Sequence, residues 1–82
     1  MRVIVVDKDR VTLALISNTL TAAGYEVTAC VDAAEALELI RQGISHLVIA
    51  DWELSGKINA PTLCQTIRRE EMWGYVYIIF VQ

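Results

Sequence analysis

Short apolar runs alternate with helix-like segments along this chain, and the alternation limits the possible folds more than any single motif does. The first run, Val3–Val6, is continuous and β-branched, which is typical of a strand covered on both faces in a parallel sheet. Further strand-like runs follow at Tyr25–Cys30, Leu47–Ala50 and Tyr75–Gln82. With helices between them, the order βαβαβαβ predicts one parallel sheet with right-handed crossovers and helices on both faces.

The first helix-like segment has an identifiable start and stop. Asp9 is a suitable N-cap, and we expect the helix to run to about Ala23, where Gly24 supplies a left-handed stop. Apolar residues recur inside this segment at near-helical spacing and are predicted to form its inner face: Val11, Leu13, Ile16 and Leu20.

The second and third helix-like segments also carry end signals. Asp32 with Glu35 makes a capping box, and Gly43 follows the second helix. Pro61 suits the first turn of the third helix, which we expect to reach about Glu71. The chain is therefore predicted to be a single α/β domain over residues 1–82.

Charge and composition exclude several classes of protein. The chain has a net charge of -3 and no basic run, which argues against nucleic acid or an anionic membrane surface as the direct partner. No apolar segment approaches the roughly 20 residues that span a bilayer, and no secretory signal follows Met1. Cys30 and Cys64 lack metal-site spacing, so we interpret them as reduced thiols of a cytoplasmic protein, with a bridge or metal pair as the alternative.

Two of the predicted strands end on a carboxylate, Asp7 after the first and Asp51 after the third, and Asp9 lies two residues beyond Asp7. In an open α/β sheet, ligands bind beyond the carboxyl ends of the strands, where strand order reverses. If these strands are neighbours, the three side chains converge there. Clustered carboxylates select a hard cation such as Mg²⁺, and an aspartate can attack phosphorus to give an acyl phosphate.

Each of these aspartates also has a simpler interpretation, because any one of them can cap a helix or solvate a strand end. Their repetition at the ends of two successive parallel-strand units favours a shared site. The sequence leaves both interpretations open.

Three stretches in this order resemble the receiver domain of two-component response regulators. They are "VIVVDKD" before a helix, "HLVIADWELSG" before a helix, and "YVYIIF" at the expected later position. The resemblance covers the whole chain. It implies a flavodoxin-like, doubly wound parallel sheet and phosphoryl transfer from a histidine kinase, a phosphotransfer protein or a small phosphodonor.

The resemblance also implies roles for individual residues. Asp51 matches the phospho-accepting aspartate, and Asp7 and Asp9 match parts of the acidic cluster that binds Mg²⁺. Glu53 matches the residue whose backbone carbonyl reaches the metal.

Three further positions are expected to modulate this chemistry. Lys8 stands where receivers carry a direct metal ligand, and its charge is expected to weaken Mg²⁺ binding. Gln82 stands where receivers place a small hydroxyl residue that contacts the phosphoryl group. Trp52 follows the acceptor position and is expected either to shield the crevice or to pack.

The chain ends before the fourth helix, fifth strand and fifth helix of a full receiver, so the phosphoryl-pairing lysine of that fifth strand has no counterpart. The sequence is compatible with a fragment of a longer regulator or with a complete chain. In both cases the uncovered sheet face and the apolar edge strand Val76–Val81 predict a homo-oligomer.

The sequence therefore favours a phospho-accepting signalling module that takes a phosphoryl group on Asp51 with Mg²⁺ assistance and is not a turnover enzyme. The alternative is a pseudo-receiver that serves as a dimerisation or docking module without phosphorylation. A metal-dependent phosphohydrolase is a weaker third interpretation, because the chain has no room for a substrate-selecting cap.

Overall fold

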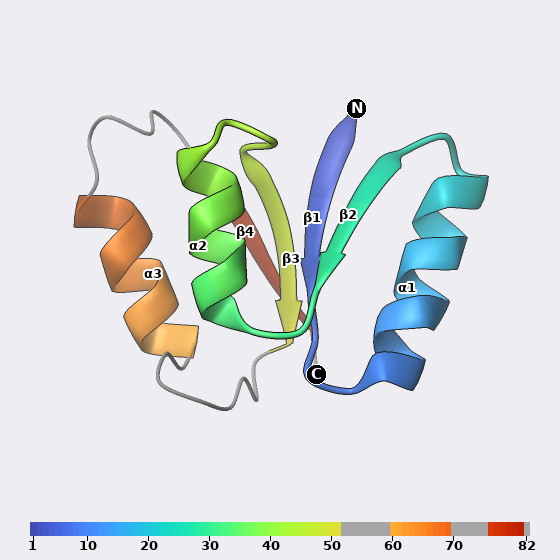
Figure 1. Ribbon diagram of the computed structural model, residues 1–82, viewed down its shortest axis with the longest axis horizontal. Coiled ribbons are helices and arrows are strands. Elements are labelled where there is room, and N and C mark those ends of the chain that lie inside the picture. Colours follow the sequence, from blue (N-terminus) through green and yellow to red (C-terminus); the bar gives the residue numbers. More distant parts are fainter. Residues whose placement is uncertain (52–59, 70–75, 82) are drawn as a thin grey trace.

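The computed structural model describes residues 1–51, 60–69 and 76–81, which form one sheet and three helices (Figure 1). The elements in chain order are β1 (Arg2–Val6), α1 (Arg10–Ala22), β2 (Glu26–Cys30), α2 (Ala33–Arg41), β3 (Leu47–Asp51), α3 (Ala60–Arg69) and β4 (Tyr77–Val81). This is the predicted βαβαβαβ order. Asp51 is itself the last residue of β3 instead of the residue after it.

All four strands are parallel, and their order across the sheet is β2-β1-β3-β4. From β1 the chain moves outward to β2, then crosses back to β3 on the other side of β1, so the strand order reverses between β1 and β3. Val6 at the end of β1 is level with Cys30 of β2 and Ala50 of β3. This register places the carboxyl ends of β1 and β3 side by side, as the convergence of Asp7 and Asp51 requires.

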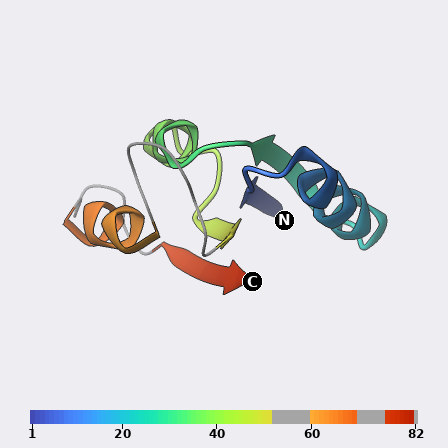
Figure 2. The same cartoon turned by 90° about the horizontal axis from the view of Figure 1, so that it is seen from below.

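The sheet has a different cover on each face. α2 and α3 pack on one face, over a core that includes Ile4, Val48 and Leu63, all of which are fully buried. α1 packs on the other face against β1 and β2, where Leu13 contacts a smaller buried cluster. Figure 2 shows α1 alone on its side of the sheet, away from β4. The helices therefore lie on both faces, as predicted.

The predicted helix ends are largely confirmed. Asp9 Oδ1 accepts a hydrogen bond from the Val11 backbone N–H at 3.0 Å, and Asp32 Oδ1 accepts one from the Glu35 backbone N–H at 2.8 Å. Gly24 has a φ of 98°, a left-handed conformation that other residues rarely adopt. The predicted end of the third helix near Glu71 lies outside the described residues.

Two predictions about α1 and the cysteines have different outcomes. Val11 was expected on the inner face of α1, but its side chain is 69% exposed, because it lies one turn before Leu15 on the outer side of the helix. Cys30 is a free, buried thiol whose Sγ donates to the Val5 carbonyl oxygen at 3.6 Å, and burial raises its pKa to about 12. This agrees with the interpretation of Cys30 as a reduced thiol, whereas the side chain of Cys64 lies outside the described residues.

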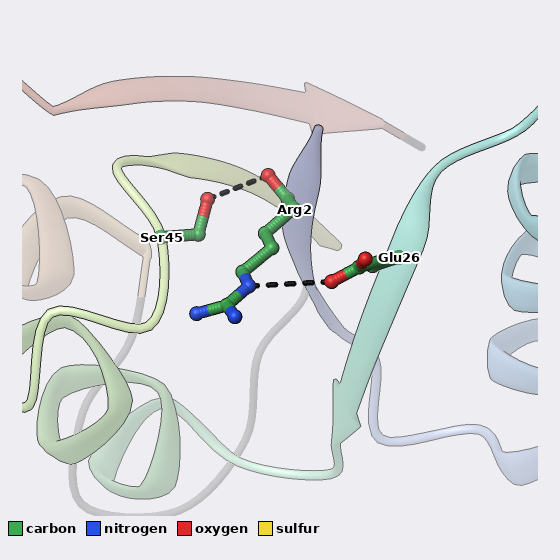
Figure 3. Close-up of polar contacts among 3 residues, drawn as sticks. All are labelled: Arg2, Glu26 and Ser45. Carbon is green, nitrogen blue, oxygen red and sulfur yellow. Dashed lines mark hydrogen bonds and ion pairs between the residues drawn. The ribbon is translucent and has the colours of Figure 1, made fainter.

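The amino end of the sheet is fixed by polar contacts (Figure 3). Arg2 Nε lies 3.2 Å from Glu26 Oε2 across β1 and β2, and Ser45 Oγ donates to the Arg2 carbonyl oxygen at 2.7 Å. Both charged side chains of the ion pair are well exposed, so it stabilises the fold weakly. These contacts lie at the end of the sheet opposite the strand-end aspartates.

Candidate functional site

The candidate site lies at the carboxyl ends of β1 and β3, where the strand order reverses. Asp7 directly follows β1, and its side chain is buried, with 2% of the residue exposed. Its backbone N–H donates to the Cys30 carbonyl oxygen at 3.1 Å, which extends the pairing with β2 by one residue. Its Oδ1 accepts from the Asp9 backbone N–H at 2.9 Å. Asp7 is therefore held rigidly, one strand away from Asp51.

The environment of Asp7 raises its pKa above the ordinary value for an aspartate. Burial is the largest cause, and the hydrogen bond from the Asp9 backbone opposes it in part. The charge of Asp51 is the next cause, followed by the charge of Asp9 and a hydrogen bond with the Asp51 side chain. A buried carboxylate beside a second carboxylate is a site that a cation would stabilise.

Asp9 has a different environment from Asp7. Its Oδ1 accepts from the Val11 N–H, and its Oδ2 accepts from Thr12 Oγ1 at 2.9 Å. These hydrogen bonds lower the pKa of Asp9, and the one from the Thr12 hydroxyl is the largest cause. Both oxygens are thus engaged at the start of α1, a role that the sequence indicated through the capping pattern. Thr12 is a contributor that the sequence analysis missed, although a hydroxyl three residues after an N-cap was the signal for it.

A groove opens beside the two strand-end carboxylates. Its volume is about 740 Å³, and it runs between α1 and the part of the sheet formed by β3 and β4. Asp7, Lys8 and Asp51 line its polar end, and Leu15 and Val81 line its apolar part. Lys8 is exposed at the polar end, so its ammonium group has access to the carboxylates without being buried among them.

The donor set fits a hard cation, because it consists of carboxylate oxygens and the buried Asp7 has no cationic partner among the described contacts. Asp7 and Asp51 are the pair that the geometry brings together. Within the described parts of the chain, no three His, Cys, Asp or Glu side chains are grouped closely enough to hold a metal ion. A shared role for Asp9 stays a prediction. Glu53, Trp52 and Gln82 lie outside the described residues.

A family model for the response regulator receiver domain matches residues 3–82. The chain belongs to the response regulator receiver family. It is therefore a receiver domain of the two-component signalling class, whose known role is to accept a phosphoryl group.

The relatives of this receiver agree with the assignment. It is 34% identical over 80 residues to a DNA-binding dual master transcriptional regulator, RpaA, of Synechocystis sp., covering 98% of this chain and 33% of the relative. A response regulator structure from Chloroflexus aurantiacus is 29% identical, with a TM-score of 0.87, over 96% of this chain and 64% of that one. The receiver thus spans a third of the curated relative's length and under two thirds of that solved chain.

A third comparison concerns the fold alone. The chemotaxis response regulator CheY4 of Vibrio cholerae is 24% identical, with a TM-score of 0.86, over 96% of this chain and 65% of that one. The flavodoxin-like, doubly wound fold implied by the sequence is thereby confirmed. In the described part of the receiver, no helix has the length and apolar character of a membrane span.

Proposed function

We propose that Asp51 is the phospho-acceptor of this receiver and that the donor is a phosphohistidine on a histidine kinase or phosphotransfer protein. One observation carries the proposal: Asp51 ends β3 beside the buried Asp7 that follows β1, at the point where strand order reverses. Parallel α/β sheets bind their ligands there.

In the proposed transfer the carboxylate of Asp51 is the nucleophile. One carboxylate oxygen attacks phosphorus, and an O–P bond forms as the N–P bond to the donor imidazole breaks. The imidazole leaves with the bonding electron pair and takes a proton from solvent. The product is an acyl phosphate on Asp51, so the receiver is a phospho-acceptor and not a turnover enzyme with an external substrate.

Mg²⁺ is the ion that this site would hold, through the carboxylates of Asp7 and Asp51. The family resemblance adds Asp9 and the Glu53 carbonyl. A bound divalent ion would neutralise the negative charge that the incoming phosphoryl group brings to two carboxylates. Because Lys8 lines the same groove, its positive charge would compete with the ion and lower its affinity.

The partners of the domain follow from its surface and charge. We propose protein partners and not direct nucleic-acid contact, because the chain has a net charge of -3. The DNA binding named for the Synechocystis relative belongs to a protein about three times as long. We also propose a cytoplasmic location and self-association through the uncovered sheet face or the β4 edge.

The test is phosphorylation of the purified chain by a small phosphodonor, acetyl phosphate, followed by intact-mass measurement. We expect one added phosphoryl group in the presence of Mg²⁺, less with a chelator, and none in Asp51→Asn. Asp32→Asn, which changes an exposed helix cap that does not line the groove, is the matched control and should label normally. Labelling of Asp51→Asn at the wild-type level would contradict the proposal. The absence of labelling in a folded wild-type chain would also contradict it and would favour the pseudo-receiver alternative.

A further inference from the structure

Lys8 carries the one positive charge among the described residues that line the groove. The same lining contains three carboxylates, those of Asp7, Asp9 and Asp51. Arg10 is exposed at the first residue of α1 and does not belong to the lining. A negatively charged group that enters the polar end of the groove therefore meets several like charges and the single opposite charge of Lys8.

The backbone of Lys8 is held from both sides. Asp7 before it is hydrogen-bonded to the end of β2 through its N–H, which donates to the Cys30 carbonyl oxygen. Asp9 after it donates its own N–H to Asp7 Oδ1 and is the N-cap of α1. The Lys8 Cα is thus fixed between a strand end and a helix start, while its exposed side chain extends along the groove.

The register of the sheet places Lys8 within reach of Asp51. Val6 is level with Ala50, so Asp7 is level with Asp51 and Lys8 is one residue further on. Parallel strands lie about 4.8 Å apart and consecutive Cα atoms about 3.8 Å apart, so the Cα atoms of Lys8 and Asp51 lie within about 9 Å. A lysine ammonium on its long, flexible stem can meet a phosphoryl group that projects from Asp51 over such a distance.

The two carboxylates that flank Lys8 in the sequence already have other donors. Asp7 accepts from the Asp9 N–H, and both oxygens of Asp9 accept from the first turn of α1, including the Thr12 hydroxyl. No ion pair within the described part of the chain includes Lys8. The ammonium group is therefore not committed to Asp7 or Asp9 and is available to a group that arrives at Asp51.

Phosphoryl transfer increases the negative charge at this end of the groove. A phosphorylated side chain carries a charge of about −1.5 to −2 near neutral pH, in place of the single charge of a carboxylate. The buried Asp7 lies beside Asp51 and adds its own charge. A cation in contact with the phosphoryl oxygens stabilises the charge that they carry in the transition state and in the product.

We propose that Lys8 binds the phosphoryl group on Asp51 and supplies part of the positive charge that the transfer needs when no divalent ion is bound. This inference rests on the function proposed above and deepens it. Lys8 then has two opposite effects, because its ammonium competes with Mg²⁺ for the unphosphorylated site and supports transfer in the absence of the ion. A lysine that only repelled the ion would have the first effect alone.

The test is the rate of labelling by phosphoramidate in a chelator, followed by intact mass, because this donor cannot acetylate the Lys8 amine. An Asp51 oxygen forms the O–P bond as the P–N bond breaks, and ammonia leaves with the bonding electron pair. We expect slow labelling of the wild type and labelling at least about tenfold slower in Lys8→Met, which loses a charged contact. Lys8→Arg keeps the charge and should retain most of the wild-type rate. Arg10→Met removes a charge outside the lining and should label as the wild type does.

Calorimetric titration of the unphosphorylated chain with Mg²⁺ is the second readout, in which Lys8→Met should bind the ion more tightly than the wild type and Arg10→Met should not. Ion binding by Lys8→Met that is no tighter would overturn the inference.

The outcomes separate this inference from the function on which it rests. If the chain labels with Mg²⁺ but the wild type does not label in the chelator, or labels there no faster than Lys8→Met, the inference alone is overturned. Equal losses in Lys8→Met and Lys8→Arg, or in Lys8→Met and Arg10→Met, with wild-type circular dichroism, would also overturn it alone. A chain that labels in neither condition overturns the proposed function and the inference together.

Discussion

At the scale of single residues, two aspartates two positions apart have opposite environments. Asp7 is buried beside another carboxylate, and its pKa is raised. Asp9 is exposed and accepts two hydrogen bonds at the start of a helix, and its pKa is lowered. The two residues are of the same type, so burial and hydrogen bonding make the difference. Asp7 is the carboxylate that a bound cation would stabilise, and Asp9 is the one that stabilises the start of α1.

Asp7→Asn should stabilise the chain at pH 7 in metal-free buffer. Because the folded-state pKa of Asp7 lies above the ordinary 3.8, ionising this carboxyl costs stability as the pH rises through the folded-state value. An asparagine has no such cost and can still accept the bond from the Asp9 N–H. Urea unfolding should show the gain at pH 7 and little of it below pH 3.8. Asp32→Asn should show no such gain, and equal or lower stability of Asp7→Asn at pH 7 would contradict this account.

Asp9→Ala should destabilise the chain at pH 7, because α1 loses its N-cap and the Thr12 hydroxyl loses its acceptor. The pKa of Asp9 is lowered, so its stabilising effect is present above 3.8 and disappears as the pH falls through the lowered value. Thermal unfolding should therefore separate the two proteins at pH 7 and not in strong acid. Asp9→Ser keeps a capping oxygen and should recover most of the loss, whereas an equal loss in Asp9→Ser would argue against the capping role.

The sequence predicts part of this residue-scale pattern. The capping role of Asp9 was foreseeable, because a short polar side chain before an apolar-periodic segment has a local signature. The near-complete burial of Asp7 was not foreseeable from the sequence, because it depends on β1 lying between β2 and β3. Strand order is a long-range property that no local pattern contains.

At the scale of elements, the contrast lies between the two faces of the sheet. α2 and α3 place fully buried side chains on one face, and α1 covers half of the other. The alternation of apolar runs and helix-like segments predicts all seven elements of the described residues, since the strand and helix periodicities are both local. The exposure of Val11 was not predicted, because a helix with apolar residues on several sides has no unique inner face in its sequence.

Leu63→Ala should cost about 2–5 kcal/mol of unfolding free energy, because this side chain of α3 is fully buried in the larger core. Gln65→Ala, an exposed change on the same helix, should remain within about 0.5 kcal/mol of the wild type. Chemical denaturation of both variants measures the difference. Similar stabilities for the two would mean that α3 does not pack on the sheet as described.

At the scale of the whole molecule, the strand-end carboxylates and an apolar surface between α1 and the sheet share one groove. Asp51 lies at its polar end, and Leu15 and Val81 line its apolar part. The family assignment explains why the strand-end carboxylates are present.

The central claim is that Asp51, and neither Asp7 nor Asp9, receives the phosphoryl group. The most direct test is to treat the phosphorylated chain with borohydride, which reduces an aspartyl phosphate to homoserine, and to locate the converted residue by tandem mass spectrometry. The account predicts homoserine at position 51 alone. Homoserine at position 7 or 9, or phosphorylated protein with no homoserine at position 51, would contradict it.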